Sequence, residues 1–368
     1  MGAGCALTAL VGPGRNVLGS QVPPLPPPIP RLNGGINIQP VRRLEEDAGF
    51  TEPLIVPELV DIQMRQVYEV GFEWIRITIS FNGFGPEFLA AIPYVRAARA
   101  LGINVLGILG QFGGGRDLMR ALARPQTREE VLRVYLSLFD DFVPPASPEL
   151  EQPGAFAMQI LNEPTHFTGV APQTYVRAFL APVFNELKIA DPQLFVVSAA
   201  EVGNADGLLR TRAMLDAGME NFCDAVAYHI YDRRWIPSLA GMTTRPVWVT
   251  ESGVIPPERH LVWITETFDE IRNGIEGVEK IFYFQLFDKE PERFRLIDIV
   301  ADPDGSFREV VESPAAIDHF AARVTEVTGN APRATYRDLV PDITRYFPTD
   351  EDLAVIRTTS FGRETWGS

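Results

Sequence analysis

Two glutamates are candidate catalytic residues, and each lies at the end of a short apolar run. Glu163 lies in an Asn-Glu-Pro tripeptide that follows the run 155–161. Glu251 lies in a Thr-Glu-Ser-Gly tetrapeptide at the end of the run 246–250. Two carboxyl groups can cleave one bond together, because the protonated one can supply a proton to the leaving group while the ionised one attacks as a nucleophile. A single loop glutamate is common on surfaces, so the pairing of the two positions carries the prediction.

The elements that would position these glutamates alternate regularly along the chain. Eight apolar, β-branched runs predict strands at residues 35–38, 72–79, 103–109, 155–161, 194–198, 225–230, 246–250 and 280–286. Segments with helical period lie between or after them at residues 57–69, 86–100, 127–142, 173–190, 205–217, 258–273 and 313–328, and 233–242 is short. Strands alternating with helices indicate βαβ units and a parallel sheet. Eight such units predict a closed (β/α)₈ barrel in the α/β class.

An open, doubly wound sheet is the alternative to a barrel. Such a sheet usually carries a glycine-rich phosphate loop after its first strand. The first run here leads into Gln-Pro-Val-Arg-Arg, and the three glycines at 113–115 lack the Lys-Ser/Thr of a phosphate loop. The sequence therefore favours the barrel. In a barrel, active-site residues lie at the carboxyl ends of the strands, so Glu163 and Glu251, after strands four and seven, should face each other across its mouth.

The two glutamate signatures resemble those of clan A glycoside hydrolases. The resemblance covers roughly residues 33–300 and rests on the Asn-Glu-Pro and Thr-Glu-Ser-Gly sequences together. It implies a retaining enzyme on a (β/α)₈ barrel that cleaves O-glycosidic bonds of a β-linked oligo- or polysaccharide. It further implies that Glu163 is the acid/base and Glu251 the nucleophile, and that a covalent glycosyl-enzyme forms.

Other strand ends fit the same resemblance. Arg76, in Trp-Ile-Arg-Ile-Thr, corresponds to the arginine of the second strand, which would hold the nucleophile ionised. His229 and Tyr231 correspond to the His-x-Tyr of the sixth strand, and their spacing places them on one face. Tyr231 would donate to Glu251, and His229 would contact the acid/base or the sugar. Asn162 would hydrogen-bond the sugar 2-hydroxyl.

Two strand ends depart from the pattern of the clan. Family 5 usually has a histidine after the third strand, where this chain has Leu-Gly-Gln-Phe-Gly at 109–113. The eighth strand usually carries a tryptophan under the cleaved sugar, whereas the run 280–286 offers Tyr283 as the expected substitute, with Phe284 and Gln285 as alternatives. These two strands also resemble family 39, so no single family is assigned. The departures leave open an inactive or weakly active barrel that binds glycans.

Further polar and aromatic side chains are expected at the same rim. Glu201 follows the fifth run and could bind sugar hydroxyls or lie on the surface. Trp235, His166 and Phe167 fall on loops at this end, where aromatic planes could stack on sugar rings or pack within the loops. These alternatives are equally open from the sequence.

Composition limits what the chain could bind. The 368 residues are 46% hydrophobic and 22% charged, with a net charge of −15, which disfavours nucleic acid and anionic membrane surfaces. Its cysteines are Cys5 and Cys223, so neither a disulfide framework nor a thiolate zinc site is expected. With four histidines in all, and an Asp-Pro-Asp-Gly turn at 302–305 that lacks the glutamate of a calcium loop, we expect no metal and no cofactor. No apolar run is long enough to span a membrane. A carbohydrate is the expected partner, and the oligomeric state stays open.

The chain divides into three parts by composition. Residues 1–32 form a leader that contains the proline-rich stretch 22–30, residues 33–328 form the barrel, and residues 329–368 form a tail packed on it. The first residues resemble a signal sequence faintly, since they lack a basic start. Secretion or a periplasmic location is slightly favoured over the cytoplasm, and the location stays open.

Overall fold

The structure is a computed structural model of the whole chain. It describes residues 34–38, 42–43, 54–80, 86–110, 116–140, 142, 154–287, 294–304, 306–328, 334–352 and 354. The leader predicted over residues 1–32 lies outside the described residues, and so does Cys5. Within the described ranges, no helix combines the length and the apolar character needed to cross a membrane.

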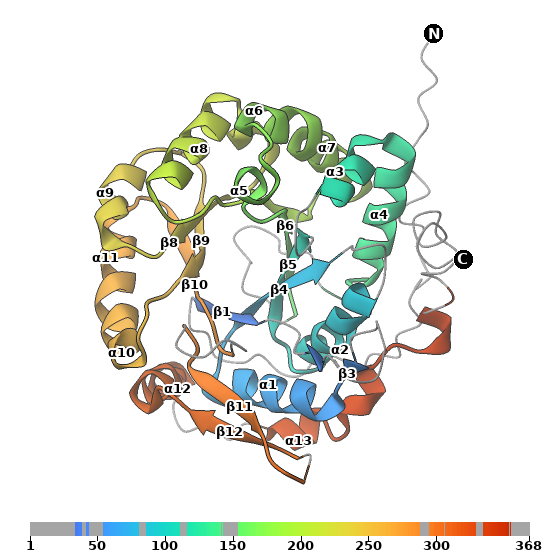
Figure 1. Cartoon of the computed structure of the whole chain (residues 1–368), viewed down its shortest axis with the longest axis vertical. Coiled ribbons are helices and arrows are strands. Elements are labelled where there is room, and N and C mark those ends of the chain that lie inside the picture. The colour runs from blue at the N-terminus through green and yellow to red at the C-terminus, as the bar shows by residue number, and fades with distance from the viewer. Residues whose placement is uncertain are drawn as a thin grey trace.

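The core of the molecule is an eight-stranded parallel sheet in the order β7-β6-β5-β4-β1-β10-β9-β8. Its strands are β1 (Gly34–Ile38), β4 (Trp74–Ser80), β5 (Asn104–Gly110), β6 (Phe156–Ile160), β7 (Phe195–Val197), β8 (Val226–Ile230), β9 (Val247–Ser252) and β10 (Val278–Tyr283). The edges meet at a parallel bridge between Val197 and Ala225, so the sheet closes into a barrel. Figure 1 shows the helices arranged as a ring around these strands. The predicted (β/α)₈ barrel is confirmed.

The helices follow the strands as expected, with a few differences. The helices are α1 (Pro57–Val70), α2 (Pro86–Ala100), α3 (Arg116–Ala123), α4 (Pro125–Ser137), α5 (Pro164–Thr168), α6 (Pro172–Thr174), α7 (Ala181–Ala190), α8 (Ala205–Asp216), α9 (Ile236–Leu239), α10 (His260–Val262), α11 (Phe268–Gly274), α12 (Pro314–Thr328) and α13 (Tyr336–Leu339). π-Helical turns at Tyr175–Leu180 and Trp263–Thr267 connect α6 to α7 and α10 to α11. The helix predicted over 127–142 begins earlier, at Pro125, because a proline suits a first helical turn where its missing N–H is not needed. A separate helix, α3, precedes it.

Helix α1 illustrates how local sequence sets these bounds. Pro57 opens the helix, and Gly71 ends it in a left-handed conformation with φ 88°. The Gly71 N–H donates to the carbonyl oxygens of Val67 and Tyr68 at 3.2 and 3.1 Å. The chain then turns directly into β4.

A separate apolar cluster fills the interior of the barrel. Trp74, Trp248 and Phe282 lie at its centre and are fully buried. The rings of Trp74 and Trp248 meet edge-on with centroids 5.2 Å apart. A Cβ at Gly35 would lie 2.4 Å from the Phe282 ring, so glycine is required by this packing. Because apolar rings plug the barrel here, the polar residues gather beyond them at the carboxyl ends of the strands.

Two further two-stranded sheets flank the barrel. Strands β11 (Ile297–Ala301) and β12 (Phe307–Val311) form an antiparallel hairpin that the sequence did not predict. The described residues of the turn predicted at 302–305 follow β11, and the Asp302 N–H donates to the Ser306 carbonyl at 2.8 Å. Strands β2 (Arg42–Arg43) and β3 (Leu54–Ile55) form the other pair.

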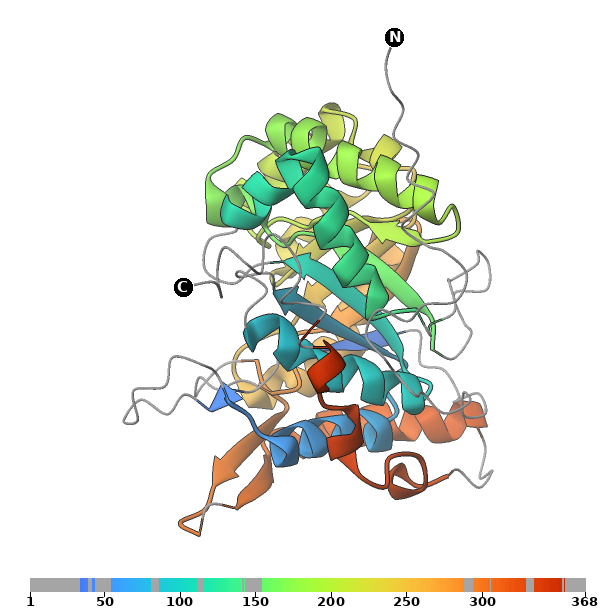
Figure 2. The ribbon, with the colours of Figure 1, turned by 90° about the vertical axis from the view of Figure 1, so that its right-hand side faces the viewer.

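The described part of the C-terminal segment packs on α1 and α2. Asp352 is fully buried and accepts from Arg96 of α2 at 3.0 and 2.8 Å. Asp61 of α1 accepts from Tyr336 at 3.1 Å and from Arg337. Figure 2 shows this segment, in red, against the blue and teal helices. The division of the chain at residues 32 and 328 stays a prediction.

Candidate active site

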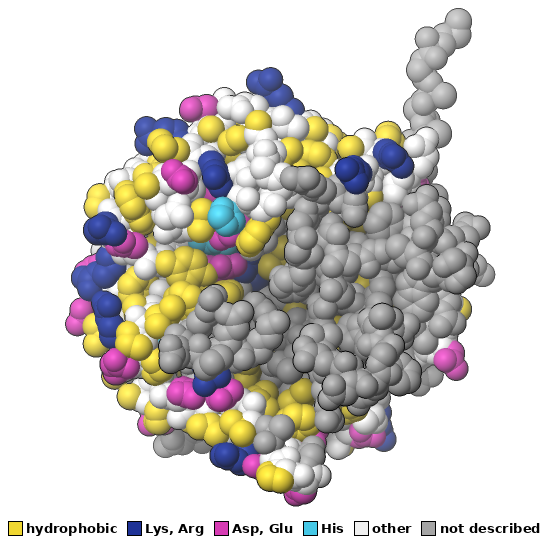
Figure 3. All heavy atoms as spheres, in the orientation of Figure 1, with side chains coloured by type: hydrophobic (Ala, Val, Ile, Leu, Met, Phe, Trp, Pro, Cys, Tyr) yellow, Lys and Arg dark blue, Asp and Glu magenta, His cyan; other side chains and the backbone are white. Residues whose placement is uncertain are grey.

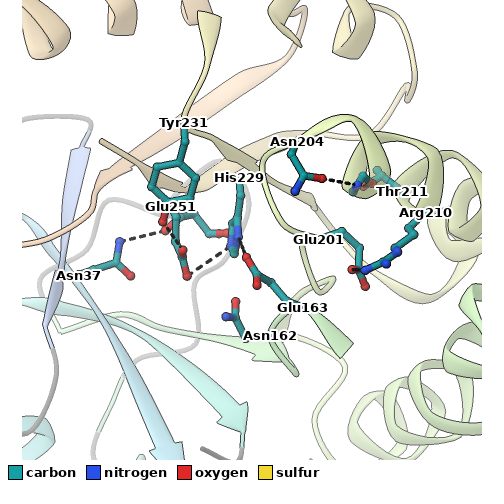
Figure 4. A network of polar contacts seen from close by, with 12 residues as sticks. Asn37, Asn162, Glu163, Glu201, Asn204, Arg210, Thr211, His229, Tyr231 and Glu251 are labelled. Atoms are coloured by element: carbon teal, nitrogen blue, oxygen red, sulfur yellow. Dashed lines mark hydrogen bonds and ion pairs between the residues drawn. The ribbon is translucent and has the colours of Figure 1, made fainter. Parts of the chain in front are cut away.

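The segment after β6 carries Glu163 in an unusual backbone conformation. Both Leu161 and Glu163 have positive φ angles, 67° and 43°, which L residues rarely adopt because of steric crowding at Cβ. The Glu163 N–H donates to the Ala200 carbonyl at the end of β7, at 3.0 Å. This turn places the Glu163 side chain at the barrel mouth, 7% exposed, facing the end of β9 (Figure 4).

Glu251 is held by donors on both of its carboxylate oxygens. Arg76 Nη1 donates to Oε1 at 2.6 Å, and the Tyr231 hydroxyl donates to Oε2 at 2.5 Å. His229 Nε2 lies 3.4 Å from Oε1. Burial alone would raise the pKa of Glu251, but the charges of His229 and Arg76 and the hydrogen bonds from Tyr231 and Arg76 outweigh it and lower this pKa. Glu251 is therefore ionised at neutral pH.

Arg76 is the centre of a buried hydrogen-bond network and is 2% exposed. Besides Glu251, its guanidinium donates to Asn37 Oδ1 at 2.7 Å, Gln159 Oε1 at 2.9 Å and Asn162 Oδ1 at 2.6 Å. Asn37 and Gln159 were not among the residues predicted from the sequence. The available signal was a polar residue inside an otherwise apolar strand, since such a residue needs a buried partner.

His229 lies between the two glutamates. Its Nδ1 is 2.8 Å from Glu163 Oε1, and its Nε2 faces Glu251. Ligand atoms of Glu163, His229 and Glu251 all lie within 4.8 Å of one another. The structure thus brings together Glu163, Glu251 and three of the residues expected to support them, Asn162, His229 and Tyr231 (Figure 4). Arg76, the fourth, donates to both Glu251 and Asn162. Figure 3 shows this face, with histidine and acidic side chains together near its middle.

The same three ligand atoms are close enough to hold a cation. Arg76 and Tyr231, however, already occupy both oxygens of Glu251. A guanidinium charge beside the carboxylate disfavours a second positive charge there. The arrangement suits an ionised carboxylate held for reaction better than a metal ligand, and the absence of a metal stays a prediction.

The expected role of Tyr283 as an aromatic floor is wrong. Side chains alternate along a strand, and Phe282 of β10 points into the barrel interior. Tyr283 therefore points outward, where it is fully buried with its ring centroid 5.7 Å from that of His260. Phe284, the alternative named from the sequence, is half-buried and meets the Tyr231 ring edge-on at 6.0 Å. Phe284 is thus the aromatic residue of this strand end that packs on Tyr231, which donates to Glu251.

The other residues expected at the rim differ in exposure. Gln285 is 2% exposed, and its Oε1 has no hydrogen-bond partner among the described residues. Trp235 is half-buried and lines a small pocket that Glu201 also borders. His166 and Phe167 of α5 are exposed. The third-strand departure at 109–113 falls mostly on residues outside the described part of the chain.

Glu201 does not lie on the surface, because its side chain is fully buried, and its binding of sugar hydroxyls stays a prediction. Its Oε1 accepts from the Thr165 N–H at 2.9 Å, and its Oε2 lies 3.7 Å from Arg210 Nη1. Burial, together with the nearby charge of Glu163, raises the pKa of Glu201, while the contacts with Thr165 and Arg210 partly offset this.

Comparison with known proteins identifies the fold. The sequence matches no protein-family model and no curated protein sequence. The chain is similar to the solved structure of an endo-β-1,4-mannanase from Thermotoga petrophila, at 14% identity and a TM-score of 0.50, over 86% of this chain and 80% of that one. It is also similar to the catalytic domain of GH30 xylanase C from Talaromyces cellulolyticus, at 12% identity and a TM-score of 0.50, over 79% and 75% of the two chains.

A third similar structure is the virulence factor SghA in complex with its substrate analog salicin. The identity is 12% and the TM-score 0.50, over 79% of this chain and 95% of that one. At these identities the likeness shows the (β/α)₈ barrel, and the resemblance to clan A glycoside hydrolases drawn from the sequence fits it.

Proposed function

We propose that this chain is a retaining β-glycoside hydrolase, with Glu163 as acid/base and Glu251 as nucleophile. The observation that carries the proposal is the opposed setting of two buried carboxylates at the mouth of the barrel. Glu251 is held ionised by Arg76 and Tyr231, whereas the Glu163 carboxylate lies 2.8 Å from His229 Nδ1. Glycoside hydrolysis by retention requires one ionised and one proton-bearing carboxyl group at this spacing.

The separation of the two glutamates supports retention over inversion. One oxygen of each carboxylate lies within 4.8 Å of the other. Retaining enzymes hold these groups about 5–5.5 Å apart, and inverting enzymes leave about 6.5–9.5 Å for a water molecule. This separation is nearer to the shorter class and supports the proposal that Glu251 reaches the sugar directly.

The reaction then runs in two displacements. In the first, Glu251 attacks the anomeric carbon as Glu163 protonates the departing oxygen, so the glycosidic bond breaks and a glycosyl ester forms on Glu251. In the second, Glu163, now ionised, takes a proton from water, which attacks the same carbon and releases the sugar and the Glu251 carboxylate. Tyr231 and Arg76 stabilise the charge that returns to Glu251.

The substrate we propose is a β-linked oligo- or polysaccharide. Arg76 fixes Asn162 through its Oδ1, which orients the amide NH₂ for a sugar hydroxyl. Phe284 supplies an apolar ring beside Tyr231, as a surface for one face of the sugar. The net charge of −15 is compatible with a neutral glycan. The similar structures named above include a mannanase and a xylanase, which act on glycans of this kind.

Azide rescue of two alanine variants tests the assignment of both roles. On a β-glycoside with a dinitrophenyl leaving group, Glu251→Ala plus azide should give the α-glycosyl azide, since azide replaces the nucleophile. Glu163→Ala plus azide should give the β-glycosyl azide, because azide replaces the activated water in the second step. The anomeric configuration is read by proton NMR. The opposite pairing of configurations would exchange the roles, and a failure of rescue in both variants would remove them.

A screen of aryl β-glycosides and β-linked polysaccharides with the wild-type protein separates hydrolysis from binding alone. Turnover that disappears in Glu163→Gln identifies an enzyme. Binding of a glycan without turnover would instead identify the barrel as a glycan-binding protein that has lost catalysis.

A further inference from the structure

We infer that Glu201 is a positioning residue for Glu163, acting through the backbone N–H of Thr165. The inference deepens the proposed function and rests on the acid/base role of Glu163. In this role Glu201, in the segment that follows β7, does not bind sugar. It holds the backbone turn that orients the carboxyl group of Glu163. The contacts on both sides of Glu163 carry the argument.

Two consecutive residues in the segment that follows β7 anchor the turn. The Ala200 carbonyl accepts from the Glu163 N–H at 3.0 Å, and Glu201 Oε1 accepts from the Thr165 N–H at 2.9 Å. Pro164, between them, has no N–H to offer. Ala200 and Glu201 therefore accept hydrogen bonds from the backbone N–H groups on either side of Pro164.

The turn needs such anchors because its conformation is unfavourable. Glu163 has a φ of 43°, and Leu161 has a φ of 67°. A non-glycine residue in this region persists only where its surroundings hold it. If the Thr165 N–H lost its acceptor, the turn could relax toward ordinary backbone angles. The carboxyl of Glu163 would then move away from His229 Nδ1, which it meets at 2.8 Å.

The Glu201 carboxylate contacts Thr165 and Arg210. Its side chain has no exposed surface. Arg210, whose side chain is 32% exposed, lies 3.7 Å from Oε2 and offsets the buried charge from the solvent side. Figure 4 shows the Glu201 carboxylate directed toward Arg210 and away from Glu251.

Two substitutions of Glu201 separate the effect of side-chain length from the effect of its charge. Glu201→Gln keeps the length and an acceptor oxygen for Thr165 but loses the charge. Glu201→Asp keeps the charge but is shorter by one methylene, so it cannot hold the Thr165 N–H at the present distance. If the contact with Thr165 is what matters, the glutamine variant behaves like the wild type and the aspartate variant does not.

The first measurement is kcat/KM on phenyl and 2,4-dinitrophenyl β-glycosides. The phenyl leaving group needs a proton from Glu163, whereas dinitrophenolate departs without one. For Glu201→Asp we expect the phenyl substrate to lose up to about 100-fold, the size of effect known for small misplacements of catalytic groups, with little change on the dinitrophenyl substrate. Glu201→Gln should show neither loss. As a matched control, Asp352→Asn alters another fully buried carboxylate and should leave the ratio of the two substrates unchanged.

The second measurement does not depend on catalysis. Hydrogen–deuterium exchange of peptides that cover residues 163–169 should be faster in Glu201→Asp than in the wild type and unchanged in Glu201→Gln. Equal losses on both substrates, or unchanged exchange in Glu201→Asp, would overturn the inference. If the wild type cleaves no aryl glycoside, the proposed function fails, and the exchange rates still decide whether Glu201 holds this turn.

Discussion

The hydroxyl of Tyr231 can be removed with little other change to the site, so Tyr231→Phe is the sharpest probe of Glu251. The hydroxyl donates to Glu251 Oε2 at 2.5 Å, while Arg76 serves the other oxygen. The Tyr231 ring packs edge-on against Phe284 at 6.0 Å, and a phenylalanine ring would keep that contact. The substitution therefore deletes one hydrogen bond to a buried carboxylate.

The size of the effect follows from the strength of that bond. A hydrogen bond to a charged group contributes about 1.5–3 kcal/mol. One unit of pKa corresponds to about 1.4 kcal/mol, so the pKa of Glu251 should rise by about one to two units in Tyr231→Phe. The charge of Arg76 remains, and it keeps part of the lowering.

The assay is the pH dependence of kcat/KM, whose acid limb reports the ionisation of the nucleophile in the free enzyme. In the wild type this limb should lie below the ordinary glutamate pKa of about 4.3, and in Tyr231→Phe it should move up by about one to two units. Tyr228→Phe is a matched control on β8, which ends just before Tyr231, because the Tyr228 side chain packs into the apolar core outside the barrel. An acid limb that stays in place in Tyr231→Phe would refute the reasoning.

The pH dependence of the free energy of unfolding is a second measure of the pKa of Glu251. A carboxylate whose pKa is lowered by folding stabilises the protein above its unfolded-state pKa and loses that contribution as pH falls through the folded-state value. The deficit in unfolding free energy of Tyr231→Phe should therefore be largest near neutral pH and shrink below about pH 4. A deficit that does not change with pH would mean that the hydroxyl contributes packing alone.

Two further substitutions test the frame around the site. Gly35→Ala would place a Cβ 2.4 Å from the Phe282 ring and 2.9 Å from Trp74 Cβ, and we expect this overpacking to lower the free energy of unfolding by about 1–3 kcal/mol, as measured by urea denaturation. If Gly35→Ala kept the denaturation midpoint of the wild type, the aromatic rings inside the barrel would have room to move. Asp352→Asn removes the charge of the buried carboxylate that accepts from Arg96, and we expect a loss of about 1.5–3 kcal/mol, seen as a lower thermal midpoint. An unchanged midpoint would mean that the C-terminal segment adds no stability.

Much of the barrel could be predicted because its strands carry a strong local signal. Short β-branched runs such as the one that became β4 are recognisable alone, and their alternation with helical segments defines a parallel sheet. Since all the strands of a barrel point the same way, residues at their carboxyl ends share one rim. Glu163 and Glu251 could therefore be placed together from their positions in the sequence, while their roles stay predictions.

The parts that sequence could not provide depend on side-chain direction and on distant contacts. The run that contains Tyr283 and Phe284 is apolar on both faces, so its pattern does not tell which residue points inward. The partners of Arg76 on other strands, Asn37 and Gln159, become neighbours only in the folded barrel. Likewise, no local pattern around Glu201 distinguishes a buried acceptor from a surface carboxylate.

The network around Arg76 also bears on how the protein acquires activity as it folds. Its partners lie 39, 83 and 175 residues away along the chain, at Asn37, Gln159 and Glu251. Asn37 in turn donates to the carbonyl of Tyr283 at 3.2 Å, across the junction of the first and last strands of the ring. No contiguous half of the chain contains this set. In a refolding experiment, the rate at which turnover returns would therefore report the pairing of the first and last strands of the barrel. This long-range event follows the formation of the single βα units.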